Sequence, residues 1–183
     1  MAKGFTQQHG VNFFKTFSPV AKIQTVRLIL FLAVQLNLLM MQFDIPNAYV
    51  KAPVHEDIYM EQPEGFSTDD GTVLKLLKAL YGTKQTGRCW NLEFTDFLLS
   101  IGFKQCDYES CLFSLISSSD SSFILLMVYV DDVLTASNND QSIESLLLRI
   151  EAKFSIPRQG FPKWFLGIKI TKDDTGSIFL FPV

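Results

Sequence analysis

Two adjacent aspartates interrupt the most apolar stretch of the chain. Residues 123–130 carry no charge and are rich in β-branched and aromatic side chains, which predicts a buried strand. Asp131 and Asp132 follow, and residues 133–136 are apolar again, so we expect a tight hairpin with both carboxylates at its tip. Neighbouring carboxylates repel each other unless a cation lies between them. A divalent metal ion would supply that charge, whereas an ordinary acidic turn explains the pair equally well.

The composition indicates a packed globular chain without a basic surface. Of 183 residues, 48% are hydrophobic and 19% are charged, which excludes intrinsic disorder. The formal net charge is −3, and Lys and Arg are scattered singly. A nucleic-acid partner would therefore be held by local geometry, by metal ions or by other parts of the protein. We see no signal peptide or membrane span, and we expect a cytoplasmic or nuclear location.

Apolar periodicity predicts an α+β fold. Helical spacing predicts helices at 21–34, 88–101 and 143–154. Strand-like runs lie at 38–43, 57–77, 111–116, 123–136, 164–170 and 178–180. Helices returning over one antiparallel sheet give an α+β sandwich with helices packed on one face and a split βαβ topology.

Asp44 supplies a third carboxylate at the end of a predicted strand. If strands 38–43 and 123–130 are neighbours in the sheet, Asp44 and Asp131 both lie at strand ends, where they could share a metal ion. Mg²⁺ takes oxygen ligands, usually one or two carboxylates with waters and substrate phosphates. Phosphoryl transfer needs little beyond positioning and charge stabilisation, so such a site requires no catalytic His or Cys.

Tyr129-Val130-Asp131-Asp132 resembles the Tyr-x-Asp-Asp hairpin of reverse transcriptases, and the copia-type retrotransposon branch in particular has similar motifs in the same order. Those motifs lie at residues 2–7, 16–22, 25–27, 42–44, 47–49, 59–63, 65–66, 80–90 and 165–168. The resemblance implies a polymerase palm-like antiparallel sheet with partial fingers, and RNA-directed DNA polymerase activity.

The resemblance also implies roles for individual residues. Asp44, Asp131 and Asp132 would be the catalytic carboxylates that bind two Mg²⁺ ions, with Mn²⁺ as a substitute. Asp44 and Asp131 would be the principal ligands, and Tyr129 and Val130 would position the primer.

Three further residues would bind the nucleotide. Tyr49 matches the aromatic position that closes over the sugar and disfavours a 2′-hydroxyl. An aromatic side chain packed under the sheet is the alternative interpretation. Gln85 and Arg88 lie where the family contacts template and incoming nucleotide, although solvated loop residues explain them equally well.

The family further implies an organisation and a set of partners. Residues 1–36 and 50–85 would form the fingers and residues 37–49 and 86–183 the palm, and we expect the thumb and ribonuclease H region to be absent. Partners would be an RNA or DNA template with primer, deoxynucleoside triphosphates and the remaining polyprotein segments, namely thumb, ribonuclease H and integrase. The location would be a cytoplasmic retrotransposon particle or the nucleus.

The chain also departs from the family pattern. Pro46 replaces the usual Lys, and Thr86-Gly87 replaces Ala-Pro or Ser-Pro, so the most flexible residue stands near a helix start. Two functions therefore remain open from the sequence. The chain is a reverse transcriptase domain using two-metal nucleotidyl transfer, or it is an inactive remnant or co-opted fragment acting at most as a binding module.

Overall fold

The computed structural model describes residues 2–63, 65–66, 71–174 and 177–182. They form two compact units: the residues up to Ser18 with Asn47–Asp96, and Pro19–Pro46 with the residues from Phe97 onward. The helix near residues 23–35 thus belongs to the second unit, whereas the predicted fingers, residues 1–36, grouped it with the first. The assignment of the two units to fingers and palm stays a prediction.

The first unit is built mainly from loops that hydrogen bonds tie together. Its N-terminal segment is held where the Ala2 N–H donates to the Tyr81 carbonyl at 2.8 Å. Gly4 lies so close to the Gly82 carbonyl that a side chain at position 4 would collide with it. The regular elements that begin in this unit are η1 (Gly4–Thr6), α2 (Ala48–Lys51), β2 (Tyr59–Met60), β3 (Leu74–Lys75) and α3 (Thr86–Ser100).

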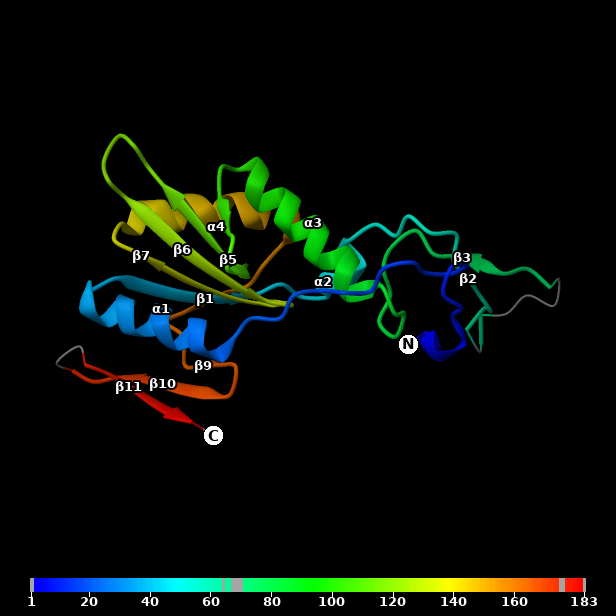
Figure 1. The fold of residues 1–183 in the computed structure, drawn as a ribbon, viewed down its shortest axis with the longest axis horizontal. Helices are drawn as coiled ribbons and strands as arrows, with labels where there is room; N and C mark the ends of the chain where they lie inside the picture. Colours follow the sequence, from blue (N-terminus) through cyan, green and yellow to red (C-terminus); the bar gives the residue numbers. More distant parts are fainter. Residues whose placement is uncertain (1, 64, 67–70, 175–176, 183) are drawn as a thin grey trace. The chain divides into compact units, whose positions relative to one another are not determined.

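The second unit contains an antiparallel sheet of six strands in the order β4-β5-β6-β7-β1-β8. Figure 1 labels β5, β6, β7 and β1 of this sheet. Those strands are β4 (Lys104–Cys106), β5 (Glu109–Ile116), β6 (Phe123–Tyr129), β7 (Asp132–Ser137), β1 (Leu39–Asp44) and β8 (Arg158–Gly160). A second sheet has the order β11-β10-β9, with β9 (Trp164–Phe165), β10 (Ile168–Lys172) and β11 (Ile178–Pro182). The predicted α+β class is confirmed.

Helices cover both faces of the larger sheet, so the prediction of helices on one face is wrong. Helix α1 (Ile23–Gln35) shares one apolar core with Met40, Met127 and Leu134. Helix α4 (Asp140–Phe154) instead contributes Leu146 to a cavity that Ile124 also lines. Because successive strand residues point to opposite faces, Ile124 and Met127 lie on different faces of β6. Each helix has its own apolar stripe, and one sheet face could not bury both.

Two further strand predictions need correction. Strands 38–43 and 123–130 are not direct neighbours, because β7 folds back along β6 and lies between β6 and β1. Residues 164–170 are two strands, β9 and β10, because Leu166 and Gly167 both have positive φ angles of 48° and 74° and reverse the chain. Part of the turn predicted at residues 173–176 lies outside the described residues, but β10 and β11 pair as expected. Within the described ranges, every helix is too short or too polar to cross a membrane.

Candidate active site

The β6–β7 hairpin has a turn of only two residues, with Asp131 in the turn and Asp132 at the start of β7. Tyr129 pairs with Asp132, which leaves Val130 and Asp131 as the turn itself. Val130 has a φ of 55°. This left-handed conformation is unusual for a β-branched residue and costs about 1–3 kcal/mol. The two-residue turn fixes the aspartates at the end of a rigid sheet.

Strand β1 brings the third carboxylate to the same place. Asp44 and Asp132 are directly opposite residues of the antiparallel β1–β7 pair, so their side chains point to the same face of the sheet. The Ile45 N–H donates to the Asp131 carbonyl at 2.9 Å and ties the hairpin turn to the end of β1. The structure therefore brings Asp44, Asp131 and Asp132 together at one end of neighbouring strands.

The carboxylates affect one another electrostatically. Burial raises the pKa of Asp44, and the negative charges of Asp131 and Asp132 raise it further. Burial also raises the pKa of Asp132, to which Asp131 adds, while a hydrogen bond from Gln42 acts in the opposite direction. Uncompensated carboxylates gathered in this way attract cations.

The donor set suits a hard cation only in part. Among the residues that the structure describes, no three His, Cys, Asp or Glu side chains are arranged so that they could hold a metal ion together. The aspartates do not form a complete cage on their own. Their oxygen-only chemistry still suits Mg²⁺, which protein sites often hold through one or two carboxylates while waters and substrate phosphates complete the shell.

Replacing Asp44 by Asn is expected to stabilise the fold near neutral pH. The folded-state pKa is raised above 3.8, so the free energy of unfolding falls as pH rises from that value through the folded pKa. The Asp44→Asn substitution removes this penalty, and solvent screening limits the gain to on the order of 0.5 kcal/mol. Urea unfolding at neutral pH and near pH 4 measures it, and the gain should shrink at the lower pH.

Asp120→Asn is the control, and it should lower the free energy of unfolding at neutral pH instead of raising it. The reason is that hydrogen bonds from Ser117 and Ser122 lower the pKa of Asp120. A loss of stability in Asp44→Asn at neutral pH would contradict the expected repulsion.

The remaining predicted site residues lie in different surroundings. Tyr129 is half-buried against the α1 core, and Val130 forms the strained turn. Tyr49 lies in the first unit, half-buried, with its ring 4.6 Å from that of Tyr81. Arg88 is half-buried, and its guanidinium donates to the Phe17 carbonyl at 3.4 Å.

Gln85 is fully engaged inside the first unit. Only 1% of Gln85 is exposed, its amide nitrogen donates to the Asn12 carbonyl at 2.9 Å, and its oxygen accepts from Gln7 at 3.0 Å. A nucleotide contact would require these bonds to break. Gln85 as placed therefore anchors the N-terminal segment, and its role with nucleotide stays a prediction.

Sequence reasoning missed Gln42. Its side chain is buried and its amide nitrogen lies 3.3 Å from Asp132 Oδ1. The sequence did contain one indication of its burial. Gln42 is an amide residue in an alternating series whose other members are Leu38, Met40 and Asp44.

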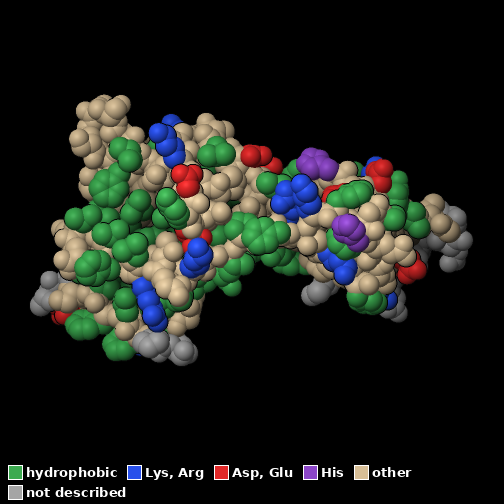
Figure 2. All heavy atoms as spheres, in the orientation of Figure 1, with side chains coloured by type: hydrophobic (Ala, Val, Ile, Leu, Met, Phe, Trp, Pro, Cys, Tyr) green, Lys and Arg blue, Asp and Glu red, His purple; other side chains and the backbone are tan. Residues whose placement is uncertain are grey.

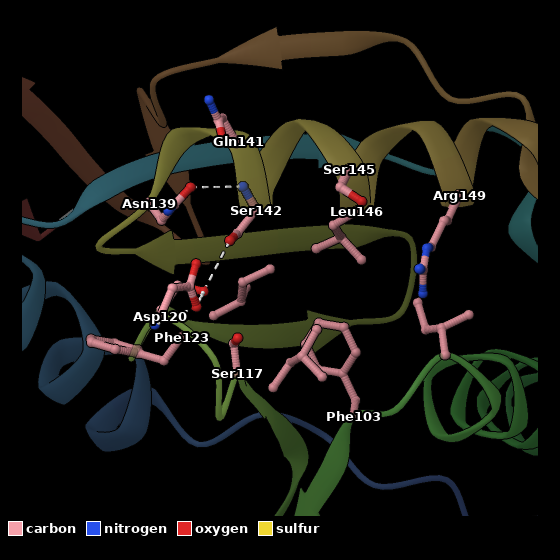
Figure 3. A pocket seen from close by; sticks show the side chains of 14 residues that line it. Phe103, Ser117, Asp120, Phe123, Asn139, Gln141, Ser142, Ser145, Leu146 and Arg149 are labelled. Carbon is pink, nitrogen blue, oxygen red and sulfur yellow. Dashed lines mark hydrogen bonds between the residues drawn. The ribbon is translucent and has the colours of Figure 1, made fainter.

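The second unit also has a cavity of about 380 Å³ (Figure 3). Phe123, Ile124 and Asn139 line it, so it lies at the end of the β6–β7 hairpin away from Asp131. Its polar groups largely bond to one another: Ser142 donates to Ser122, and Ser122 donates to Asp120. Asn139 accepts from the Ser142 N–H as the cap of α4. This cavity contains none of the three grouped aspartates, and its hydrogen bonds give Asp120, Ser122, Asn139 and Ser142 structural roles.

Comparison with known proteins shows the family of the chain. The family model described as "Reverse transcriptase (RNA-dependent DNA polymerase)" matches residues 1–181. The chain belongs to this reverse transcriptase family. The resemblance to copia-type reverse transcriptases inferred from the sequence is thereby confirmed.

The relatives of this reverse transcriptase domain are transposon proteins. It is 36% identical to the "Retrovirus-related Pol polyprotein from transposon RE1" of Arabidopsis thaliana, over 96% of this chain and 12% of that protein. It is 36% identical to the corresponding polyprotein from transposon TNT 1-94 of Nicotiana tabacum, over 96% of this chain and 13% of that protein. A putative transposon Ty5-1 protein of Saccharomyces cerevisiae is 31% identical over 75% of this chain and 44% of its own length. The chain thus spans about an eighth of the two polyproteins.

Proposed function

We propose that this reverse transcriptase domain catalyses RNA-directed DNA synthesis by two-metal nucleotidyl transfer. The observation that carries the proposal is the register that sets Asp44 opposite Asp132, with Asp131 in the adjoining turn. Asp44 and Asp131 are the proposed principal ligands of Mg²⁺, or of Mn²⁺ in its place, and Asp132 supports them. When bound, the two ions supply positive charge for the primer 3′-oxygen and the leaving pyrophosphate.

The protein's own contribution is orientation and charge. The short turn at Val130 and the bond from Ile45 hold the carboxylates rigidly, so little reorganisation is needed when the substrate arrives. Tyr129 and Val130 are the proposed contacts of the primer end. In the first unit, Tyr49 is the proposed steric check on the 2′-hydroxyl and Arg88 a proposed nucleotide contact.

The proposed substrates are a template–primer duplex and deoxynucleoside triphosphates, and the proposed setting is a Pol polyprotein in a cytoplasmic particle or the nucleus. Other polyprotein segments would supply most of the grip on nucleic acid. The net charge is −3, and on the face that Figure 2 shows, the coloured Lys and Arg side chains are scattered without forming a continuous stripe. Since phosphate neutralisation dominates such binding, the 183 residues alone should bind template weakly.

Primer extension on an RNA template with Mg²⁺ tests the proposal. We expect weak extension, visible chiefly at low ionic strength, and a loss on the order of a hundredfold or more in Asp131→Asn. Products are measured on a sequencing gel, with omission of one nucleotide as the check on template direction. Equal extension by the wild type and Asp131→Asn would contradict the proposed role of the carboxylates. No extension with either metal ion would favour an inactive remnant.

A further inference from the structure

Gln42 occupies a place where an apolar side chain would be expected. Met40, Gln42 and Asp44 alternate along β1, and Met40 lies in the core beneath α1 together with Leu38, which directly precedes the strand. Gln42 is 8% exposed, although an amide buried without a hydrogen bond costs several kcal/mol. No buried side-chain nitrogen or oxygen of the described residues lacks a partner, so the burial of Gln42 is compensated.

The partner of Gln42 is one of the grouped carboxylates. Its Nε2 lies 3.3 Å from Asp132 Oδ1. Gln42 is opposite Leu134 on β7, so Asp132 is its diagonal neighbour, a separation that a long side chain spans. Asp44, directly opposite Asp132, is two residues further along β1 on the same face. Gln42 therefore reaches Asp132 from the interior side of the carboxylate group.

An amide suits this place better than other side chains. It donates a hydrogen bond to the carboxylate without adding a positive charge, so the negative charge stays available to a cation. A leucine would leave the carboxylate unanchored, and a lysine would neutralise it. Partners that orient a metal-site carboxylate in this way typically change metal affinity or activity roughly 10–100-fold when they are removed.

We infer that Gln42 is a positioning residue, which fixes the Asp132 carboxylate through its side-chain amide and thereby sets the geometry of the three-aspartate group. The inference rests on the proposed function, because it assigns Gln42 to the same metal-binding carboxylates.

The first test observes the hydrogen bond without any metal. In protein labelled with ¹⁵N-glutamine, the side-chain amide of Gln42 is identified by its loss in Gln42→Leu. In Asp132→Ala, one amide proton should move upfield and exchange faster with solvent, because its carboxylate acceptor is gone. Asp120→Ala removes a carboxylate that bonds to Ser122 and should leave the signal unchanged. A signal that does not respond to Asp132→Ala overturns the inference.

The second test measures Mn²⁺ affinity from the paramagnetic resonance of the free ion. Gln42→Leu should bind Mn²⁺ roughly tenfold more weakly, as should Gln42→Asn, whose shorter side chain keeps the amide but cannot reach. Thr135→Val is the matched control. Thr135 is also a buried polar residue, and its hydroxyl donates to the Met41 carbonyl at 3.0 Å. Its side chain faces the α4 side of the sheet, so Thr135→Val should change the Mn²⁺ affinity less than about twofold.

The two proposals fail in different ways. If the wild type binds Mn²⁺ and Gln42→Leu binds it equally well while folded, the inference about Gln42 is wrong and the proposed function stands. If the wild type binds no more Mn²⁺ than Asp44→Ala/Asp131→Ala, the proposed metal site is wrong. The amide signal then decides alone whether Gln42 holds Asp132.

Discussion

Glu109→Ala is expected to lower the free energy of unfolding by about 3 kcal/mol, because it leaves buried donors without an acceptor. Glu109 is 6% exposed, and its carboxylate accepts from the Lys22 N–H at 3.3 Å, the Thr25 hydroxyl at 3.1 Å and the Cys111 N–H at 3.3 Å. Lys22 is the N-cap of α1, which has no side-chain cap of its own and no acidic residue in its first turn. Glu109 therefore caps this helix from β5, where a negative charge also suits the helix dipole.

Urea unfolding followed by tryptophan fluorescence measures this loss. Glu109→Gln is the matched variant, because its amide oxygen can still accept from the helix while its amide nitrogen opposes the Cys111 N–H. We expect Glu109→Gln to lower the free energy of unfolding, but by less than Glu109→Ala does. A change below about 1 kcal/mol in Glu109→Ala would show that the cap is dispensable.

Phe43→Ala is expected to lower the free energy of unfolding by about 3–5 kcal/mol, the second large effect. Phe43 is completely buried, lies opposite Val133 on β7 and directly precedes Asp44. Its removal leaves a cavity beneath the strand end that carries the carboxylate. Since domains of this size are stable by about 5–15 kcal/mol, the variant should lose a large share of its stability.

Two variants calibrate the result in the same unfolding assay. Phe43→Leu keeps most of the volume and should lose less than about 1.5 kcal/mol. Phe31→Ala removes the same side chain from an exposed position of α1, where 57% of it is accessible, and should change stability by less than about 1 kcal/mol. Similar losses for Phe31→Ala and Phe43→Ala would contradict the buried position of β1.

Local features of this fold could be predicted from the sequence. Helix α3 was expected at 88–101 and lies at Thr86–Ser100, because the spacing of its apolar residues is a property of the segment itself. The β6–β7 hairpin could also be predicted, because two apolar runs flank the acidic pair, but its two turn residues are Val130 and Asp131, and Asp132 begins β7. Asp44, Asp131 and Asp132 could be chosen as candidates from their places at strand ends, and their proximity follows from the observed register.

Features that depend on distant partners could not be predicted. Glu109 contacts Thr25 across 84 residues, and nothing in either segment indicates the other. The place of β7 between β6 and β1 decides which strands meet, and the helix faces follow from that order. Gln85 looked like a loop residue because its burial comes from Gln7 and Asn12, far away in the chain. Gln42 was missed for the same reason, since its role depends on the hydrogen bond to Asp132, which is distant in the sequence.

The two-residue turn at Val130 and Asp131 bears on how this domain tolerates changes in length. A substitution at Val130 alters local strain by about 1–3 kcal/mol and leaves the strand pairing intact. Inserting or deleting one residue there would instead shift β7 by one position and turn Asp132 toward α4, away from Asp44. Single-residue insertions and deletions at the hairpin tip should thus separate the carboxylates even where every side chain is kept.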